Sequence, residues 1–475
     1  MKKFGYCSMI ALLALMLIGL GFLSTPASAT PQKRFPDIRP MIFVHGYTGS
    51  AYQFEWQAMR FASNGYPQNY LNAFEYDSVS WGGIFTPPNI PFQTATLAQL
   101  DQRIDAILSE TQADKVELLG HSQGTAVSMA YLNSSPARAA KVAHYVSLDG
   151  GGAASLPGGV PTLAMWAEFR MFPGPIPTIV GAENHVCPKS PHNETATSPV
   201  SFAYMYKFFT GDDPETTEIL PEPYGLIKLA GRAVLFPQNT GVAGATLEIY
   251  ELNGETGARK YKKPWAIYPI DETGNWGPFR ARAGAHYELN IVREGMNHHF
   301  YLEPRIRSDY FIRMNTSPVG TGLGELMTRN PDQTNLIITR NREWLGDQND
   351  GFNDILAING INIVNAPNAA ANHMLVAYFI CDWLSDHKTN LTPPIPVPAL
   401  NSIFMSAVDL YLRGATPADA TISIVSTPRG NCGTMHGINV PNWAIINESR
   451  TFIEAITVQI DDYIQSRCDE KWPVQ

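Results

Sequence analysis

One stretch of the sequence constrains the fold more than any other. A short apolar run beginning at Val116 leads into Gly120-His121-Ser122-Gln123-Gly124, and a segment of helical character follows. A serine in this position lies on a tight turn between a strand and a helix, where the backbone is strained and the hydroxyl is exposed. Glycines are needed on both sides, because a Cβ there would collide with the neighbouring strand and helix. The pattern predicts that Ser122 is a nucleophile; the alternative is a glycine-rich turn with a buried serine.

A second strand ends in a loop that complements the serine. Residues 40–44 form an apolar run, and His45-Gly46-Tyr47-Thr48-Gly49 follows it. Gly46 lets the backbone N–H of Tyr47 turn inward, and the N–H of Gln123 comes directly after the nucleophile. Two such donors stabilise a tetrahedral oxyanion by roughly 3 kcal/mol each. We therefore predict an oxyanion hole formed by Tyr47 and Gln123, with His45 bracing the loop.

An acid is expected at the end of a later strand. The apolar segment 142–148 ends in Asp149, and glycines follow it. The carboxyl ends of parallel strands form the edge at which such sheets place their sites. Asp149 is therefore the preferred acid, and Glu168 and Glu183, near other strand ends, remain alternatives.

A histidine base is expected after the last strand of this half. His192 lies in a loop before the helical segment 200–209, whereas His185 lies close to a strand end. A neutral imidazole would take the proton of the serine, and a carboxylate would fix its tautomer. We prefer His192 and keep His185 as the alternative. This chemistry requires neither a metal nor a cofactor.

These motifs together resemble a known family. They are similar to the two-domain secreted or thermophilic lipases of the α/β-hydrolase superfamily, above all to the archaeal type with a large β-rich C-terminal domain. The likeness is strong over about residues 40–218 and thinner beyond. The residues that carry it are Phe43–Ser50, Leu118–Thr125, Leu148–Gly151 and Thr197–Pro199. The resemblance implies Ser122 as nucleophile, Asp149 as acid, His192 as base, and Tyr47 and Gln123 as oxyanion hole.

The expected fold class follows from the motifs and the resemblance. Residues 30–218 are expected to form an α/β-hydrolase domain, with a mostly parallel sheet and flanking helices. Short alternating runs between turn signals then predict β-rich C-terminal domains of sandwich or barrel type. We place a transthyretin-like or Ig-like sandwich at 225–312 and a second β-rich region, with one helix at 369–384, at 313–475.

One departure from the family concerns the lid. Lipases of this type can carry a long helical lid, but here only the apolar, proline-rich loop 82–93 occupies that place. We interpret it as a short rim over the site, and a packed connection is the alternative. Long triglyceride chains are therefore not an assured substrate.

The N-terminus predicts export. Lys2 and Lys3 precede an apolar stretch at 9–23 and the tripeptide Ala27-Ser28-Ala29. This is the pattern of a cleavable signal peptide over residues 1–29, with the mature chain starting near Thr30 in the periplasm or outside the cell and no stable membrane anchor. The mature chain would keep Cys187, Cys381, Cys432 and Cys468, and an oxidising compartment permits one or two disulfides among them. The sequence does not determine the pairing, but we prefer a disulfide within the last three of these cysteines.

The net charge and two short motifs bear on whether the chain binds nucleic acid, membranes or metal ions. A net charge of -9 argues against nucleic acid and anionic membrane surfaces. The acidic stretch 347–354 misses the calcium-loop pattern by one residue, and we interpret it as a solvated turn. The pair His298-His299 is expected at the surface. No metal site is predicted.

The sequence thus predicts a secreted serine hydrolase that cleaves carboxylic esters of lipids, as a lipase or carboxylesterase. An extracellular polyester depolymerase of the polyhydroxyalkanoate type is the first alternative, because the C-terminal β-rich half could meet a lipid or polymer surface. A non-catalytic lipid-binding or polymer-binding protein on a hydrolase scaffold is the second.

Overall fold

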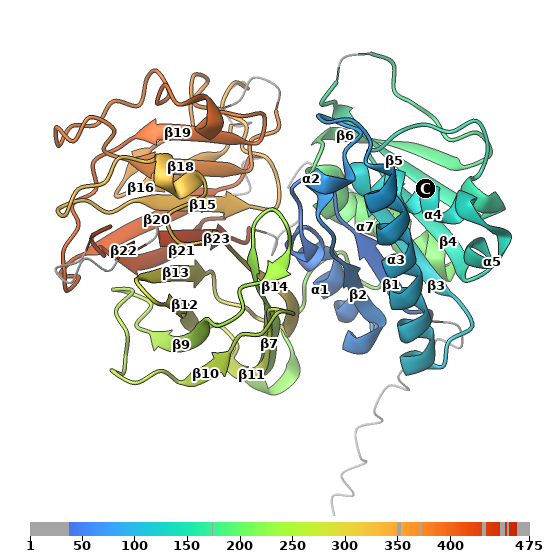
Figure 1. Cartoon of the computed structure of the whole chain (residues 1–475), viewed down its shortest axis with the longest axis horizontal. Helices are drawn as coiled ribbons and strands as arrows, with labels where there is room; N and C mark the ends of the chain where they lie inside the picture. Colours follow the sequence, from blue (N-terminus) through green and yellow to red (C-terminus); the bar gives the residue numbers. More distant parts are fainter. Residues whose placement is uncertain are drawn as a thin grey trace, which may run out of the picture. The chain divides into compact units, whose positions relative to one another are not determined.

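The first half of the chain is built on a six-stranded parallel sheet (Figure 1). The strand order is β2-β1-β3-β4-β5-β6, and every neighbouring pair is parallel. The carboxyl ends of all six strands therefore meet at one edge. The strands are β1 (Met41–Val44), β2 (Leu71–Phe74), β3 (Val116–His121), β4 (Val142–Leu148), β5 (Thr162–Phe169) and β6 (Glu183–Pro191).

Helices cover this sheet, and α3 packs against α4 on one face (Figure 1). The side chains of Leu100, Ile104 and Ile107 repeat at helical spacing and are fully buried against strand residues such as Ile42 and Leu118. The helices are α1 (Glu55–Ser63), α2 (Ser78–Trp81), α3 (Ile90–Thr111), α4 (Gln123–Ser134), α5 (Pro136–Ala139), α6 (Glu194–Thr197) and α7 (Pro199–Thr210), and the short 3-10 helix η1 is Ala51–Phe54.

Helix α3 begins earlier than the sequence suggests. The side chain of Asn89 accepts a hydrogen bond from the N–H of Phe92, and Pro91 lies in the first turn. These start signals lie inside the segment that we expected to be a loop. The apolar rim therefore ends at Asn89 rather than at Gln93.

The described residues of the second half form three sheets. A nine-stranded sheet has the order β10-β9-β12-β13-β23-β15-β18-β19, with β22 beside β13, and the other two are β11-β7-β14 with β8, and β17-β16-β20-β21. The strands are β7 (Leu226–Leu235), β8 (Thr240–Gly241), β9 (Thr246–Leu252), β10 (Ala266–Pro269), β11 (Asn275–Arg282), β12 (His286–Arg293), β13 (Met296–Leu302), β14 (Asp309–Thr316), β15 (Leu336–Arg340), β16 (Ile355–Ile358), β17 (Ile361–Asn362), β18 (Ala377–Cys381), β19 (Met405–Asp409), β20 (Thr421–Thr427), β21 (His436–Pro441), β22 (Phe452–Ile453) and β23 (Ile456–Ile460).

The large sheet is shared by two sandwiches. Leu229 and Phe279, from the β11-β7-β14 sheet, share one core with Leu289 of the large sheet. Ile424, from the β17-β16-β20-β21 sheet, shares another core with Ile338 of the large sheet. The expected fold class, an α/β-hydrolase followed by β-rich sandwiches, is confirmed, while the expected domain limits stay predictions.

Two local expectations are wrong. The helix expected at 369–384 is absent over 377–381, where all five residues of β18 are buried between β15 and β19. A strand covered on both faces reads as a continuous apolar run, which periodicity cannot tell from a buried helix. His298 and His299 are 1% and 3% exposed rather than at the surface, because β13 lies inside the large sheet.

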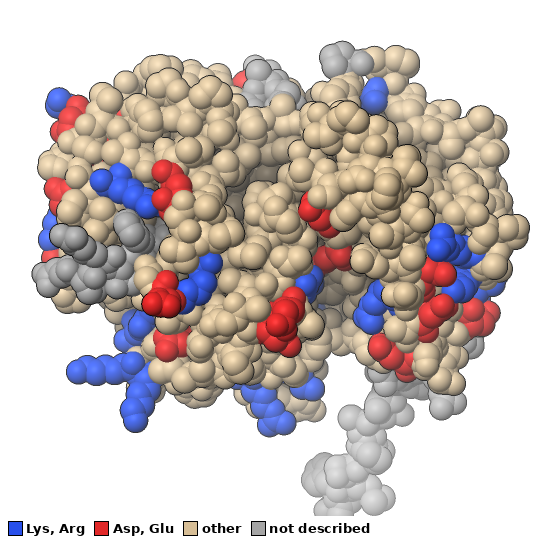
Figure 2. All heavy atoms as spheres, in the orientation of Figure 1, with Lys and Arg blue, Asp and Glu red and all other residues tan. Residues whose placement is uncertain are grey.

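The computed structural model describes residues 38–172, 174–348, 353–369, 373–429, 434–446, 452–453 and 456–462. The expected signal peptide, the residues Cys432 and Cys468, and the centre of the acidic stretch at 349–352 lie outside these ranges. On the face seen in Figure 2, acidic and basic side chains stand in small groups separated by wide uncharged surface.

Candidate active site

Ser122 lies on the predicted sharp turn between β3 and α4. Its backbone φ is 54° and its ψ is -123°, which is a strained conformation for a residue other than glycine. Its N–H donates to the carbonyl of Leu148 at 2.9 Å. A Cβ on Gly120 would lie 2.6 Å from the carbonyl oxygen of Gly124, and a Cβ on Gly124 would lie 2.1 Å from that of Val44. Both glycines are therefore required by close packing.

Asp149 and His192 meet at the same edge of the sheet. His192 Nδ1 lies 2.5 Å from Asp149 Oδ2, and both side chains are almost completely buried. Burial alone would raise the pKa of Asp149, but the hydrogen bond and charge of His192, with the N–H of Ala167 at 2.9 Å, lower that pKa. The carboxylate is thus charged and holds the proton on Nδ1 of the imidazole.

The alternative acids and base have other contacts. His185 lies within β6 against the ring of Tyr204, with ring centroids 4.3 Å apart. Glu168 accepts the N–H of Lys189 at 2.6 Å, and Glu183 lies exposed at the start of β6. The geometry therefore favours Asp149 and His192.

His121, the neighbour of Ser122, contacts the loop of His192 directly. The two imidazole rings lie 4.4 Å apart, and His121 Nε2 donates to the backbone carbonyl of His192 at 3.0 Å. Burial, reinforced by the nearby charge of His192, lowers the pKa of His121 well below its usual value. A neutral imidazole agrees with these hydrogen bonds, because Nε2 of His121 donates while its Nδ1 accepts from Gln53 Nε2 at 2.5 Å.

Gln53 connects three segments around the serine. Its Oε1 accepts the N–H of Gly46 at 3.3 Å, and its Nε2 donates to His121 and to Asn193 Oδ1 at 3.1 Å. One side chain thus joins the predicted oxyanion loop at 45–49, the turn of Ser122 and the loop of His192. Sequence reasoning missed Gln53; the only signal was a polar residue within the otherwise apolar segment 51–54.

The loop formed by residues 45–49 packs closely on Ser122. A Cβ on Gly46 would lie 2.8 Å from Ser122 Cβ, so the backbone before Tyr47 lies against the serine. The side chain of Gln123 donates to the carbonyls of Ser78 and Gly82 at 3.0 and 2.9 Å, which anchors the rim. His45 is buried and braces the loop: its Nδ1 donates to the Gly46 carbonyl at 2.8 Å and its Nε2 accepts the N–H of Tyr76 at 3.3 Å.

Side chains from the β-rich half also reach this region. Glu343 accepts the backbone N–H groups of Asn193 at 2.5 Å and Glu194 at 3.1 Å. The carboxylate of Glu194 in turn pairs with Arg342 and Arg429. No motif of the sequence pointed to these contacts.

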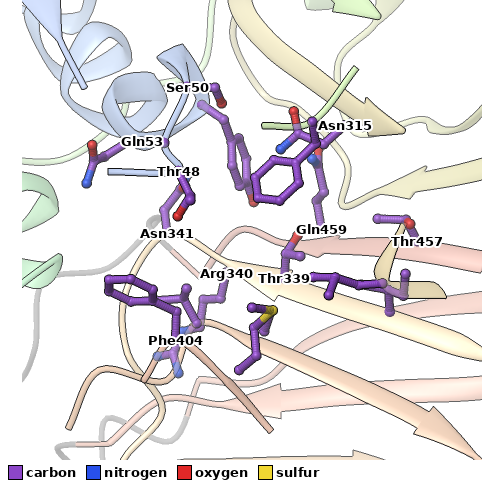
Figure 3. Close-up of a pocket in the computed structure, with 18 of the residues that line it drawn as sticks. Thr48, Ser50, Gln53, Asn315, Thr339, Arg340, Asn341, Phe404, Thr457 and Gln459 are labelled. Carbon is purple, nitrogen blue, oxygen red and sulfur yellow. The ribbon is translucent and has the colours of Figure 1, made fainter. Parts of the chain in front are cut away.

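A cavity of about 240 Å³ opens beside the oxyanion loop and the loop of His192. Its wall includes Tyr47, Gln53 and Asn193, and Figure 3 shows Gln53 and Thr48 on one side and Phe404 on another. Most of the remaining wall comes from the β-rich half. That half supplies apolar side chains (Phe300, Ile337, Val376, Phe379, Phe404 and Met405) and polar ones (Asn315, Thr339, Arg340, Asn341, Thr457 and Gln459). Walls that combine apolar side chains with polar groups are typical of sites for small ligands.

Neither a metal centre nor a membrane span is found among the described residues. No group of three histidine, cysteine, aspartate or glutamate side chains in these ranges could hold a metal ion. Of the acidic stretch 347–354, Asp347 pairs with His373 at 2.9 Å. Within the same ranges no helix is both long and apolar enough to cross a bilayer.

Comparison with family models identifies three segments. Residues 38–139 match the model described as lipase (class 2), which includes Ser122. Residues 225–319 match the model described as lipase C-terminal domain, and residues 322–464 match a further model described as a C-terminal domain. The resemblance that the motifs indicated is confirmed by these matches.

Several solved structures are similar at low identity. Lipase B from Aspergillus fumigatus is 15% identical over 40% of this chain and 57% of its own, so the match spans little more than half of that enzyme, with a TM-score of 0.29. A CIB-like hydrolase from Thermoplasma acidophilum is 15% identical over 35% of this chain and 84% of its own (TM-score 0.25). Phospholipase PlaB from Legionella pneumophila is 7% identical over 54% and 86% (TM-score 0.27). Likeness at this level carries no weight for function.

Proposed function

We propose that this chain, which matches lipase family models over residues 38–139 and 225–319, is an exported lipase or carboxylesterase that uses Ser122, His192 and Asp149 as a catalytic triad. The observation that carries the proposal is the 2.5 Å contact between His192 and Asp149. It lies at the sheet edge that also carries Ser122 on its strained turn.

The proposed mechanism follows from the roles of these groups. Asp149 keeps the proton on Nδ1 of His192, so Nε2 is free to take the proton of the Ser122 hydroxyl as it attacks the ester carbonyl. The backbone N–H groups of Tyr47 and Gln123 stabilise the oxyanion. The alcohol leaves with the proton from His192, and water then hydrolyses the acyl-enzyme by the same steps in reverse.

We propose that the apolar acyl group of the substrate binds in the cavity, which reaches Tyr47 of the proposed oxyanion loop although Ser122 and His192 are not part of its wall. Its wall joins Tyr47 of the oxyanion loop to aromatic and aliphatic side chains of the β-rich half, such as Phe379 and Phe404. Burial of apolar surface contributes about 25 cal/mol per Å². We therefore propose that the β-rich half helps to bind the acyl chain and meets the lipid surface.

Replacement of Ser122 by alanine tests the proposal. We expect the variant to lose hydrolysis of p-nitrophenyl esters and labelling by an alkyl phosphonate, while a chain-length series on the wild type ranks the acyl groups. Unchanged hydrolysis by the variant would exclude Ser122 as nucleophile. Faster release of acid from polyhydroxyalkanoate films than from triglyceride emulsions would favour the depolymerase, and binding of esters without turnover would favour the non-catalytic alternative.

Export is tested separately. We propose that residues 1–29 direct the chain out of the cytoplasm and are removed after Ala29. The intact mass of protein recovered from the periplasm or the medium should correspond to a chain that starts at Thr30. Recovery of uncleaved protein from the cytoplasm alone would exclude export.

A further inference from the structure

The peptide group between His192 and Asn193 is held from both sides. Its carbonyl oxygen accepts a hydrogen bond from His121 Nε2 at 3.0 Å, and His121 adjoins the nucleophile. Its N–H donates to Glu343 at 2.5 Å, and Glu343 follows β15 in the β-rich half. The backbone on one side of the proposed base is therefore fixed by two residues that lie far apart in the sequence.

Glu343 makes a second bond to the same loop. Its other carboxylate oxygen accepts the N–H of Glu194 at 3.1 Å, so both oxygens are used on consecutive N–H groups. The side chain is completely buried, and Arg429 donates to the Glu343 backbone carbonyl at 2.6 Å, which limits its movement. A carboxylate that accepts two backbone N–H groups forms charge-assisted hydrogen bonds, which are stronger than neutral ones.

We propose that Glu343 is a positioning residue for the proposed base: its carboxylate holds the backbone of His192 and Asn193 so that the imidazole faces Ser122. This inference rests on the proposed function. The carboxylate of Glu343 contacts backbone N–H groups in this loop and does not contact the reacting atoms. Its effect on the reaction is exerted through the placement of His192, and a displacement of about 1 Å in such a group can cost about 100-fold in rate.

The ionisation of Glu343 gives the proposal a specific readout. Burial raises its pKa to about 7, although the N–H of Asn193 and the charges of His192 and Arg429 oppose the rise; Glu194 adds to it. Well above pH 7 both oxygens accept as parts of a carboxylate, whereas well below it one of them carries a proton and is a much poorer acceptor. Glu343→Gln mimics the protonated form at every pH, since its amide offers only one acceptor.

The test compares kcat of wild type and Glu343→Gln on a p-nitrophenyl ester from pH 5.5 to pH 9. We expect a kcat about 10-fold lower in the variant at pH 9, a KM within about twofold, and a wild-type-to-variant ratio that falls towards 1 as the pH drops through about 7. A ratio that is constant with pH, or equal to 1 throughout, would overturn the proposal.

Two controls separate positioning from folding. Glu303→Gln changes another buried carboxylate of the β-rich half that accepts one backbone N–H, from Asp461 at 2.5 Å, and it should give no pH-dependent ratio. If Glu343→Gln does not fold, Glu343→Asp, which keeps a carboxylate on a shorter side chain that cannot reach both N–H groups, should lower kcat with a KM within about twofold, and wild-type kcat in that variant would overturn the proposal. If wild-type protein neither hydrolyses esters nor reacts with the phosphonate, the proposed function fails as well; a flat ratio in an active enzyme removes only the role of Glu343.

Discussion

Glu75 at the end of β2 accepts a hydrogen bond from Arg313 of β14 at 2.7 Å, and both side chains are buried. The same carboxylate oxygen accepts the N–H of Ala51, which starts the short helix that carries Gln53. An arginine of the β-rich half thus supports a residue two positions from the network around Ser122. The buried carboxylate of Glu75 connects the two segments, because it accepts hydrogen bonds from both.

The same arrangement occurs at two further glutamates of the hydrolase half. Glu55 pairs with Arg305 at 2.6 Å, and Glu194 pairs with Arg342 at 3.3 Å, all with buried side chains. In each pair the hydrolase half supplies the acid and the β-rich half the base. Removal of one partner from a buried pair costs about 3–5 kcal/mol, because the other charge is left without compensation. The β-rich half is therefore part of the scaffold of the site.

The first prediction concerns Asp149, the acid of the proposed triad. Asp149→Asn should reduce kcat by about four orders of magnitude with little loss of stability, because the amide no longer fixes the tautomer of His192. Glu168→Gln is the matched control at the neighbouring strand β5, and its kcat should change less than about threefold. Steady-state kinetics and thermal unfolding of both variants check this, and a larger loss in Glu168→Gln would move the acid to that residue.

The fold of the first half could be predicted because its signals are local. The turn at Ser122 requires glycines within two residues, and Asp149 and His192 follow directly after strands whose carboxyl ends share one edge. Strand order places the two residues at the same edge, with β5 between their strands, and the conformation of the segments that follow β4 and β6 brings the side chains to within 2.5 Å. Their catalytic roles remain predictions.

The supporting residues could not be predicted because their partners are distant. Gln53 lies 68 residues from His121, and Glu343 lies 150 residues from Asn193. The burial of His298 depends in part on Thr457 of β23, which is 159 residues away. A polar side chain in an apolar segment shows that a partner is needed but does not identify it.

The second prediction concerns Gln53. Gln53→Ala removes the hydrogen bonds to Gly46, His121 and Asn193 together, and we expect kcat to fall about 10- to 100-fold with a small change in KM. Gln57→Ala is the control, because that glutamine lies on the next turn and is completely buried, whereas Gln53 is half-buried, and it donates to Ser198 and Ser201 at the start of α7. Both variants should unfold at a lower temperature, and an equal loss of kcat in both would refute a specific role for Gln53.

The last prediction uses the ion pair that joins the two halves at Glu75. Burial would raise the pKa of Glu75, but Arg313 and Arg232 outweigh it and lower the pKa to about 2, from an ordinary value of 4.5. Because the folded pKa is the lower one, this carboxylate stabilises the fold fully above about pH 4.5, and the contribution is lost as the pH falls towards 2. The separation corresponds to about 3 kcal/mol.

Urea unfolding of wild type and Glu75→Gln between pH 7 and pH 2.5 measures this contribution. The difference in unfolding free energy should be about 3 kcal/mol at pH 7 and should shrink as the pH falls below 4.5. Glu110→Gln is the control, since Glu110 is exposed and lies 3.7 Å from Arg103, and such surface pairs contribute less than about 1 kcal/mol. If the difference in unfolding free energy stays constant down to pH 2.5, then Glu75 stabilises the contact between the two halves by its shape and not by its charge.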